Sequence, residues 1–201
     1  MVVDSELLAN GVLADLLTEL GHPTSVEDSI REYLGGTIAG VRQVVREQTG
    51  RDLPASFEAT YHDRLFGSFA DGLRPVPGIR AVLDGLDLPY CLASSGTEDR
   101  IVRSLTVTGL LGYFADRIFS AEHVSEGKPA PDLFLYAAAA MGAAPERCVV
   151  IEDSPHGVRA GHAAGMTVLG YVALTPAGRL ADADATFASM AELPELLDRF
   201  R

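Results

Sequence analysis

Hydrophobic and polar positions follow a helical rhythm in the first third of the chain. Apolar residues recur every four positions at Leu8, Val12, Leu16 and Leu20, which places them on one face of a helix. Further segments of helical character follow up to about residue 72, with no strand among them. The first third therefore predicts a compact unit of four helices.

Caps and stops set the expected bounds of these helices. Small polar residues accept hydrogen bonds from the first free N–H groups of a helix, glycine ends one, and proline suits the first turn. The first helix is expected to begin after Asp4 or Ser5 and to end at Gly21, and the second to begin at Ser25 and end at Gly35 and Gly36. The third is expected to run from Thr37 to Gly50, and the fourth from Pro54 to Gly72.

The pattern changes at residues 74–78, Arg-Pro-Val-Pro-Gly, which we interpret as a hinge. Strands and helices then alternate. The expected elements are strands at 90–93, 117–120, 148–151 and 167–172, with helices after Thr97, at 131–141 and at 155–164. This alternation predicts an α/β fold, a doubly wound parallel sheet with helices on both faces. We expect a helical domain at 5–74 and an α/β domain at 75–201.

Composition and net charge limit the classes of binding partner that the protein can have. The chain has 201 residues, 47% of them hydrophobic, which is enough for one sizeable core with a small accessory domain. Its net charge of −12 disfavours nucleic acid and requires any phosphate site to be locally positive. Residues 1–6 lack the basic and apolar segments of a secretory signal, so we expect none, and the longest apolar run, 133–144, is too short to cross a bilayer. We expect a cytoplasmic protein without a membrane partner; the sequence does not reveal the oligomeric state.

Two cysteines, Cys91 and Cys148, fall inside strand-like runs. We interpret them as buried free thiols rather than as a disulfide or a nucleophile.

Polar residues follow three of the expected strands, at the sheet edge where open α/β sheets bind ligands. The first group is Ser94, Ser95 and Gly96, followed by Thr97. A hydroxyl and a helix N-terminus there can donate hydrogen bonds to phosphate oxygens. An ordinary helix-capping turn explains the same residues.

The second group centres on Lys128, in Gly-Lys-Pro-Ala-Pro-Asp. Pro129 and Pro131 stiffen the backbone beside it, and a fixed ammonium stabilises the charge of a transferring phosphoryl group. A solvated surface lysine is the alternative.

The third group is Glu152 and Asp153, directly after an apolar strand. Two adjacent carboxylates repel each other unless a cation neutralises them, and such hard oxygen ligands suit Mg²⁺. The alternative is a helix cap formed by Asp153 or Ser154.

Taken in order, these three groups resemble conserved motifs of the haloacid dehalogenase-like hydrolases. The likeness extends through Gly157 and Gly165 and covers nearly the whole chain. It is nearest to the β-phosphoglucomutase-like and sugar-phosphate phosphatase subfamily, which has a Rossmann-like core and an inserted helical cap. The resemblance implies that Ser94 binds the phosphoryl group, Lys128 balances its charge, and Asp153 with Glu152 holds Mg²⁺.

One family motif is missing. Its members carry Asp-x-Asp-Gly-(Val or Thr)-Leu-(Val or Ile)-Asp-Ser on the first strand, where the first Asp is the nucleophile and the second the general acid and base. The present chain matches only the end of that motif, at Asp4 and Ser5. We expect roughly 10 upstream residues, a central strand with its loop, to be missing through a late-assigned start or a truncation. The chain as given is then expected to be inactive.

The resemblance also places a substrate-contacting loop at residues 33–37, which makes Gly35 and Thr37 candidate substrate contacts; a helix stop and cap explain them equally well. The loop lacks the Arg of the mutases, and no His lies near Leu8, so a phosphatase is favoured over a mutase. For His156, near Asp153, we expect a supporting or solvent-facing role.

The sequence thus predicts a Mg²⁺-dependent hydrolase of small phosphorylated metabolites, acting through an aspartyl-phosphate in the full-length protein. A non-catalytic protein that binds or senses phosphometabolites remains the alternative. Dehalogenation is disfavoured because it has no use for a metal-binding Glu152 and Asp153. A dinucleotide oxidoreductase is disfavoured because no Gly-x-Gly-x-x-Gly follows any strand.

Overall fold

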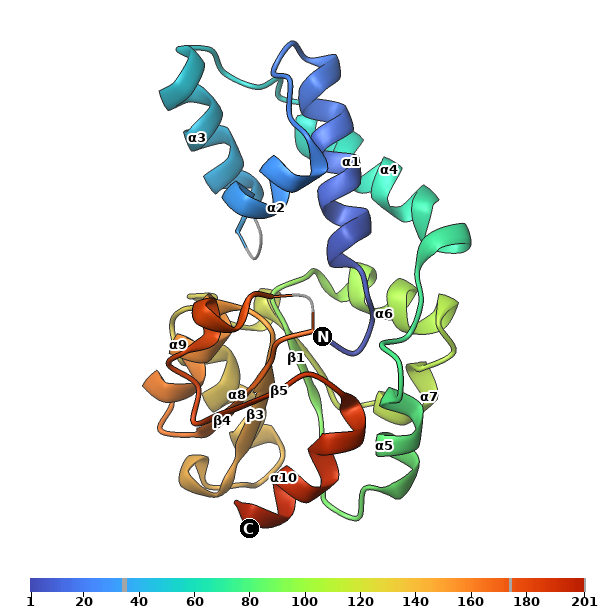
Figure 1. Ribbon diagram of the computed structural model, residues 1–201, viewed down its shortest axis with the longest axis vertical. Helices are drawn as coiled ribbons and strands as arrows, with labels where there is room; N and C mark the ends of the chain where they lie inside the picture. Colours follow the sequence, from blue (N-terminus) through green and yellow to red (C-terminus); the bar gives the residue numbers. More distant parts are fainter. Residues whose placement is uncertain (34–35, 174, 201) are drawn as a thin grey trace. The chain divides into compact units, whose positions relative to one another are not determined.

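The computed structural model describes residues 1–33, 36–173 and 175–200. Within it the chain divides into two compact units, one made of Met1–Val3 with Pro75–Arg201 and the other of Asp4–Arg74. Figure 1 follows the chain through both. We call them the α/β unit and the helical unit and describe each by itself.

In its described residues the helical unit holds four α-helices. They are α1 (Glu6–Glu19), α2 (Val26–Tyr33), α3 (Ile38–Thr49) and α4 (Phe57–Gly72). Its interior contains fully buried Leu17, Leu65 and Phe69. A buried hydrogen bond of 2.8 Å from the Ser29 hydroxyl to the Asn10 side chain ties α2 to α1, so that neither polar group is left unpaired.

The described part of the α/β unit contains five short strands. They are β1 (Leu92–Ser94), β2 (Ile118–Ser120), β3 (Val149–Glu152), β4 (Thr167–Tyr171) and β5 (Ala185–Phe187). Every pairing between them is parallel: β1 with β2, β3 with β4, and β4 with β5. The α/β class and the parallel strands expected from the sequence are therefore confirmed.

Helices cover both faces of these strands (Figure 1). The elements are α5 (Ile79–Gly85), α6 (Glu98–Val107), α7 (Leu111–Phe114), α8 (Asp132–Ala140), α9 (Pro155–Ala163) and α10 (Leu193–Arg199), with 3₁₀ turns η1 (Ala121–His123), η2 (Pro145–Arg147), η3 (Ala177–Leu180) and η4 (Met190–Glu192). Alternate residues of β4 show how the two faces are filled. Leu169 packs with side chains of α5, α6 and α10, whereas Val168 packs with those of α8 and α9. This alternation follows from the two-residue period of a strand.

The strands form two separate ladders, β1–β2 and β3–β4–β5. In the described part of the chain, β1 pairs only with β2, and β3 pairs only with β4. One edge of β1 and one edge of β3 therefore have no ladder partner among the described residues. All three side chains of β1 are only partly buried, although an inner strand of a parallel sheet is normally buried on both faces. The strand expected from the family resemblance stays a prediction.

No helix in the described residues is long and apolar enough to cross a membrane.

Candidate active site

The side chain of Lys128 joins the carboxyl ends of β1 and β3. Its Nζ donates to the carbonyl oxygen of Ala93 at 3.3 Å and forms an ion pair with Glu152 Oε1. Ala93 immediately precedes Ser94 on β1, and Glu152 ends β3. The structure thus brings together the ends of three segments that lie far apart in the sequence.

Lys128 and Glu152 are both buried, each with 8% of its side chain exposed. The ammonium also lies 4.5 Å from the centre of the Phe134 ring, a distance at which a cation is attracted to the ring face. Lys128 is therefore not a solvated surface residue. A buried charged pair holds its geometry firmly, because breaking it would leave an uncompensated charge in a dry environment.

The Glu152 carboxylate accepts hydrogen bonds from residues at the N-terminal end of α9. Its Oε2 accepts hydrogen bonds from the N–H groups of Asp153 at 3.1 Å and Ser154 at 3.2 Å, and from the Ser154 hydroxyl at 3.0 Å. A helix N-terminus favours negative charge there. Gly157 completes the seat: a Cβ atom at that position would lie 1.9 Å from Glu152 Cδ. Glycine at 157 leaves the space that the carboxylate occupies.

Asp153 is the more open of the two carboxylates. Its Oδ2 lies 3.4 Å from the amino group of Met1, and 20% of its side chain is exposed. Its main-chain carbonyl accepts a hydrogen bond of 2.7 Å from the hydroxyl of Thr175, a buried residue after β4. Sequence reasoning did not single out Thr175, because its contact with Asp153 depends on the folded course of the chain.

Ser94 sits in a turn that leaves its hydroxyl proton available. Ser94 Oγ accepts the N–H of Gly96 at 3.1 Å, and a hydroxyl that accepts one bond can still donate another. Ser95 is exposed in the same turn, and Thr97 caps α6 by accepting the N–H of Arg100. Capping, the simpler explanation of this segment, is thus confirmed for Thr97, and it leaves Ser94 free for another role.

His156 lies in the first turn of α9, and its Nδ1 is buried without a hydrogen-bond partner in the described structure. Burial lowers the pKa of His156, and the positive charges of Arg159 and Arg179 lower it further. The imidazole is therefore neutral at neutral pH.

The metal-ligand prediction rests on Asp153 and Glu152. Within residues 1–33, 36–173 and 175–200, no three His, Cys, Asp or Glu side chains cluster so as to hold a metal ion. Both oxygens of Glu152 already accept bonds, one from Lys128 and the other from donors at the start of α9. Asp153 is the more exposed of the two carboxylates, with 20% of its side chain accessible against 8% for Glu152. The described donors fit a cation at Asp153 more readily than at Glu152.

Two substrate contacts, Thr37 and Gly35, were predicted outside the α/β unit. Thr37 caps α3 by accepting the N–H of Gly40, so the cap explanation holds for it. Gly35 lies outside the described residues. Their contact with substrate stays a prediction.

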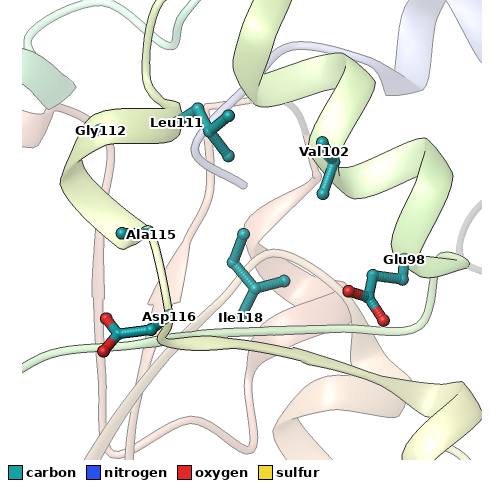
Figure 2. A pocket seen from close by; sticks show the side chains of 7 residues that line it. All are labelled: Glu98, Val102, Leu111, Gly112, Ala115, Asp116 and Ile118. Atoms are coloured by element: carbon teal, nitrogen blue, oxygen red, sulfur yellow. The ribbon is translucent and has the colours of Figure 1, made fainter.

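A separate hollow of about 560 Å³ lies beside β2 (Figure 2). It is lined by Glu98, Val102, Leu111, Gly112, Ala115, Asp116 and Ile118. None of the predicted phosphate or metal ligands is among these residues, so this hollow is distinct from the site around Lys128.

Comparisons with known proteins agree on one family. The model of the haloacid dehalogenase-like hydrolases matches residues 3–165. The chain is 28% identical to the 6-phosphogluconate phosphatase of Escherichia coli, over 97% of the chain and 89% of that protein. It is 31% identical to hexitol phosphatase A of the same organism, over 78% and 72%. A solved haloacid dehalogenase-like protein of unknown function from Agrobacterium tumefaciens shares 34% identity and a TM-score of 0.89, over 98% and 93%.

Proposed function

The chain belongs to the haloacid dehalogenase-like hydrolase family, and from that premise we propose that it is a phosphatase of small phosphate monoesters, most of all sugar phosphates. Relatives named as phosphatases of 6-phosphogluconate, hexitol phosphate and fructose 1-phosphate support this substrate class. A phosphorylated sugar or sugar acid is accordingly the expected partner.

The observation that carries the proposal is the convergence on Lys128. Its Nζ contacts the carbonyl of Ala93 in β1 and the carboxylate of Glu152 at the end of β3, so that the Ser94 hydroxyl and the Asp153 carboxylate belong to the same edge of the α/β unit. A donor, a cation and a carboxylate at one edge suit a phosphate dianion better than a neutral ligand. In a chain with a net charge of −12, the Lys128 ammonium is already paired with Glu152, so the positive charge that an anionic substrate needs would come from Lys128 together with Mg²⁺ bound at Asp153.

In this proposal Ser94 and its turn bind the transferring phosphoryl group. Ser94 Oγ accepts from Gly96 and keeps its own proton, which donates to one phosphate oxygen. The turn formed by Ser95 and Gly96 lies against a second phosphate oxygen. Lys128 balances the charge that spreads over the phosphoryl oxygens during transfer.

We assign Mg²⁺ to Asp153, with Glu152 beside it. Asp153 presents an open carboxylate, and Glu152 holds Lys128 in place and contributes negative charge next to the metal. Bound Mg²⁺ would offset the charge of the phosphoryl group and orient it.

The nucleophile in this proposal is an aspartate of an Asp-x-Asp segment in the full-length protein, which would form an aspartyl-phosphate. Its strand would lie between β1 and β3. This placement is supported by the strand pairing in the described residues. There, β1 has no partner on the edge opposite β2, and β3 has none on the edge opposite β4. Unpaired strand edges inside a domain are costly, because buried backbone groups need hydrogen bonds.

The test is phosphate release from a panel of sugar phosphates, with and without Mg²⁺, by protein made from the natural reading frame. Asp153→Asn should lower turnover by at least about 100-fold, because loss of an electrostatic contributor to the transition state costs about that much. Asp116→Asn is the matched control, since Asp116 is exposed and lines the separate hollow. Activity without Mg²⁺, or equal activity in the two variants, would remove Asp153 from the site. Phosphate binding without any turnover would favour the non-catalytic binding protein.

A further inference from the structure

The fully buried hydroxyl of Ser120 links the two strands that carry the phosphate-binding turn. Ser120 ends β2 with none of its surface exposed, and in the parallel ladder it stands directly beside Ser94. We infer that Ser120 is a positioning residue of the site, which fixes the turn after β1 and so aims the Ser94 hydroxyl. This inference rests on the proposed phosphate site.

A continuous chain of hydrogen bonds connects the two serines. Ser120 Oγ donates to the carbonyl oxygen of Gly96 at 2.8 Å, and the N–H of Gly96 donates to Ser94 Oγ at 3.1 Å. Gly96 is thus held on both sides. Because Ser94 Oγ accepts the N–H of Gly96, its own proton points away from that N–H and stays available for a ligand.

A second contact holds the next residues of the same turn. Glu122 Oε2 accepts the N–H of Glu98, the first residue of α6, at 2.7 Å. Ser120 caps the short η1 turn by accepting the N–H of Glu122 at 3.1 Å, which sets the direction of that carboxylate. Ser120 Oγ also lies 3.4 Å from Glu122 Oε2, a longer and weaker contact than its bond to Gly96.

His123 closes this network on its outer side. Its Nδ1 accepts the N–H of Ser120 at 3.3 Å, and its Nε2 lies 3.5 Å from Glu98 Oε2. The turn after β2 therefore contacts the first residue of α6 through Glu122 and His123, and the turn before α6 through Ser120. A cap for η1 alone would only need the Ser120 oxygen as an acceptor; the proton given to Gly96 is what ties this turn to Ser94.

The experiment measures the affinity of inorganic phosphate in the presence of Mg²⁺ by calorimetric titration of the full chain. We compare Ser94→Ala and Ser120→Ala with Ser104→Ala. Ser104 is a matched control because it is also buried and its hydroxyl also donates to a carbonyl, that of Arg100 at 2.7 Å, but within α6. Ser120→Ala removes the bond to Gly96 and the cap of η1, whereas Ser104→Ala removes the bond to Arg100, so thermal stability should fall in both variants and at least as much in Ser120→Ala.

The expected order separates positioning from plain stability. Ser94→Ala should weaken phosphate binding at least about tenfold, and Ser120→Ala about five- to tenfold, the worth of one well-formed hydrogen bond. Ser104→Ala should leave the affinity within about twofold of the parent, since it touches neither Ser94 nor Gly96. If Ser94→Ala binds phosphate normally, the proposed site itself is wrong. If Ser94→Ala is weakened but Ser120→Ala is not, the positioning role alone is overturned.

Glu122→Ala keeps the test decisive if Ser120→Ala does not fold. The Glu122 side chain is exposed, so its removal should leave the fold intact while freeing the N–H of Glu98. We expect phosphate binding to weaken about two- to fivefold, as for loss of a solvent-exposed hydrogen bond. Unchanged affinity in that variant would count against the network.

Discussion

Gly157→Ala is the sharpest structural test of the seat that holds Glu152. An ideal Cβ at this position would lie 1.9 Å from Glu152 Cδ and 2.1 and 2.3 Å from the two carboxylate oxygens. Ordinary contact between such atoms is about 3.5 Å, so the carboxylate or the first turn of α9 has to move by more than about 1 Å. The neighbour is no free-swinging chain end, because Lys128 and the N–H groups of Asp153 and Ser154 hold it.

The magnitude follows from what the shift disrupts. Separating a buried ion pair costs about 3–5 kcal/mol, and alanine in place of glycine inside a helix returns about 1 kcal/mol. We therefore expect Gly157→Ala to lower the free energy of unfolding by about 2–4 kcal/mol, a large part of the total stability of a typical domain. The same displacement should weaken phosphate binding, because Lys128 loses its partner.

Urea unfolding followed by circular dichroism measures this loss. Gly112→Ala is the control, since Gly112 lies in α7 of the same unit and a Cβ there meets nothing within 4 Å. That variant should change stability by no more than about 1 kcal/mol. Equal unfolding midpoints for the two variants would refute the reasoning that Glu152 is held rigidly against α9.

Three further predictions concern ionisable groups. Lys128→Met should cost about 3 kcal/mol of unfolding free energy by leaving Glu152 charged and buried, and adding Glu152→Gln should recover part of it; a harmless single variant would contradict the buried pair. Burial raises the pKa of the Cys91 thiol to about 11, so its alkylation rate should climb only as pH approaches 11, and a midpoint at or below 9 would refute this. The hydrogen bond from the main-chain N–H of Val168 lowers the pKa of Asp184. The stability that ionised Asp184 contributes should therefore be lost as the pH falls below about 4, and Asp184→Asn should flatten that loss in acid unfolding curves.

Local signals in the sequence predicted much of the fold. Thr37, Thr97 and Ser154 all cap helices, and Gly50 ends α3 in a left-handed conformation. These features depend on hydrogen bonds within one turn, which is why the sequence reveals them. The expected strand bounds differ from the observed ones by no more than two residues, as is usual for element ends.

Short and non-local features escaped prediction. β5 spans only Ala185–Phe187, and three residues are too few to show an alternating pattern. The pairing of Lys128 with Glu152 joins residues 24 positions apart, and nothing in the spacing distinguishes that pairing from two separate ligands. The link from Ser120 to Gly96 also spans 24 positions. Such contacts arise from the neighbouring ends of different strands and need the folded sheet to be seen.

The candidate site was predicted from the sequence only in part. The sequence singled out Ser94, Lys128 and Asp153 because polar residues directly after apolar strands share one edge of a parallel sheet. It also proposed that Glu152 holds Mg²⁺ together with Asp153, and in the structure the Glu152 carboxylate is bonded to Lys128 and to donors at the start of α9. A carboxylate at a strand end has the same sequence signature whether it faces a metal ion or a lysine.

A crystal structure of the protein grown with phosphate and Mg²⁺ tests the central claim most directly. Our account predicts a phosphate ion within hydrogen-bonding distance of both Ser94 Oγ and Lys128 Nζ, with the metal ion on the Asp153 carboxylate. Phosphate bound elsewhere, for example in the hollow beside β2 in Figure 2, with Ser94 and Lys128 free of it, would contradict the account.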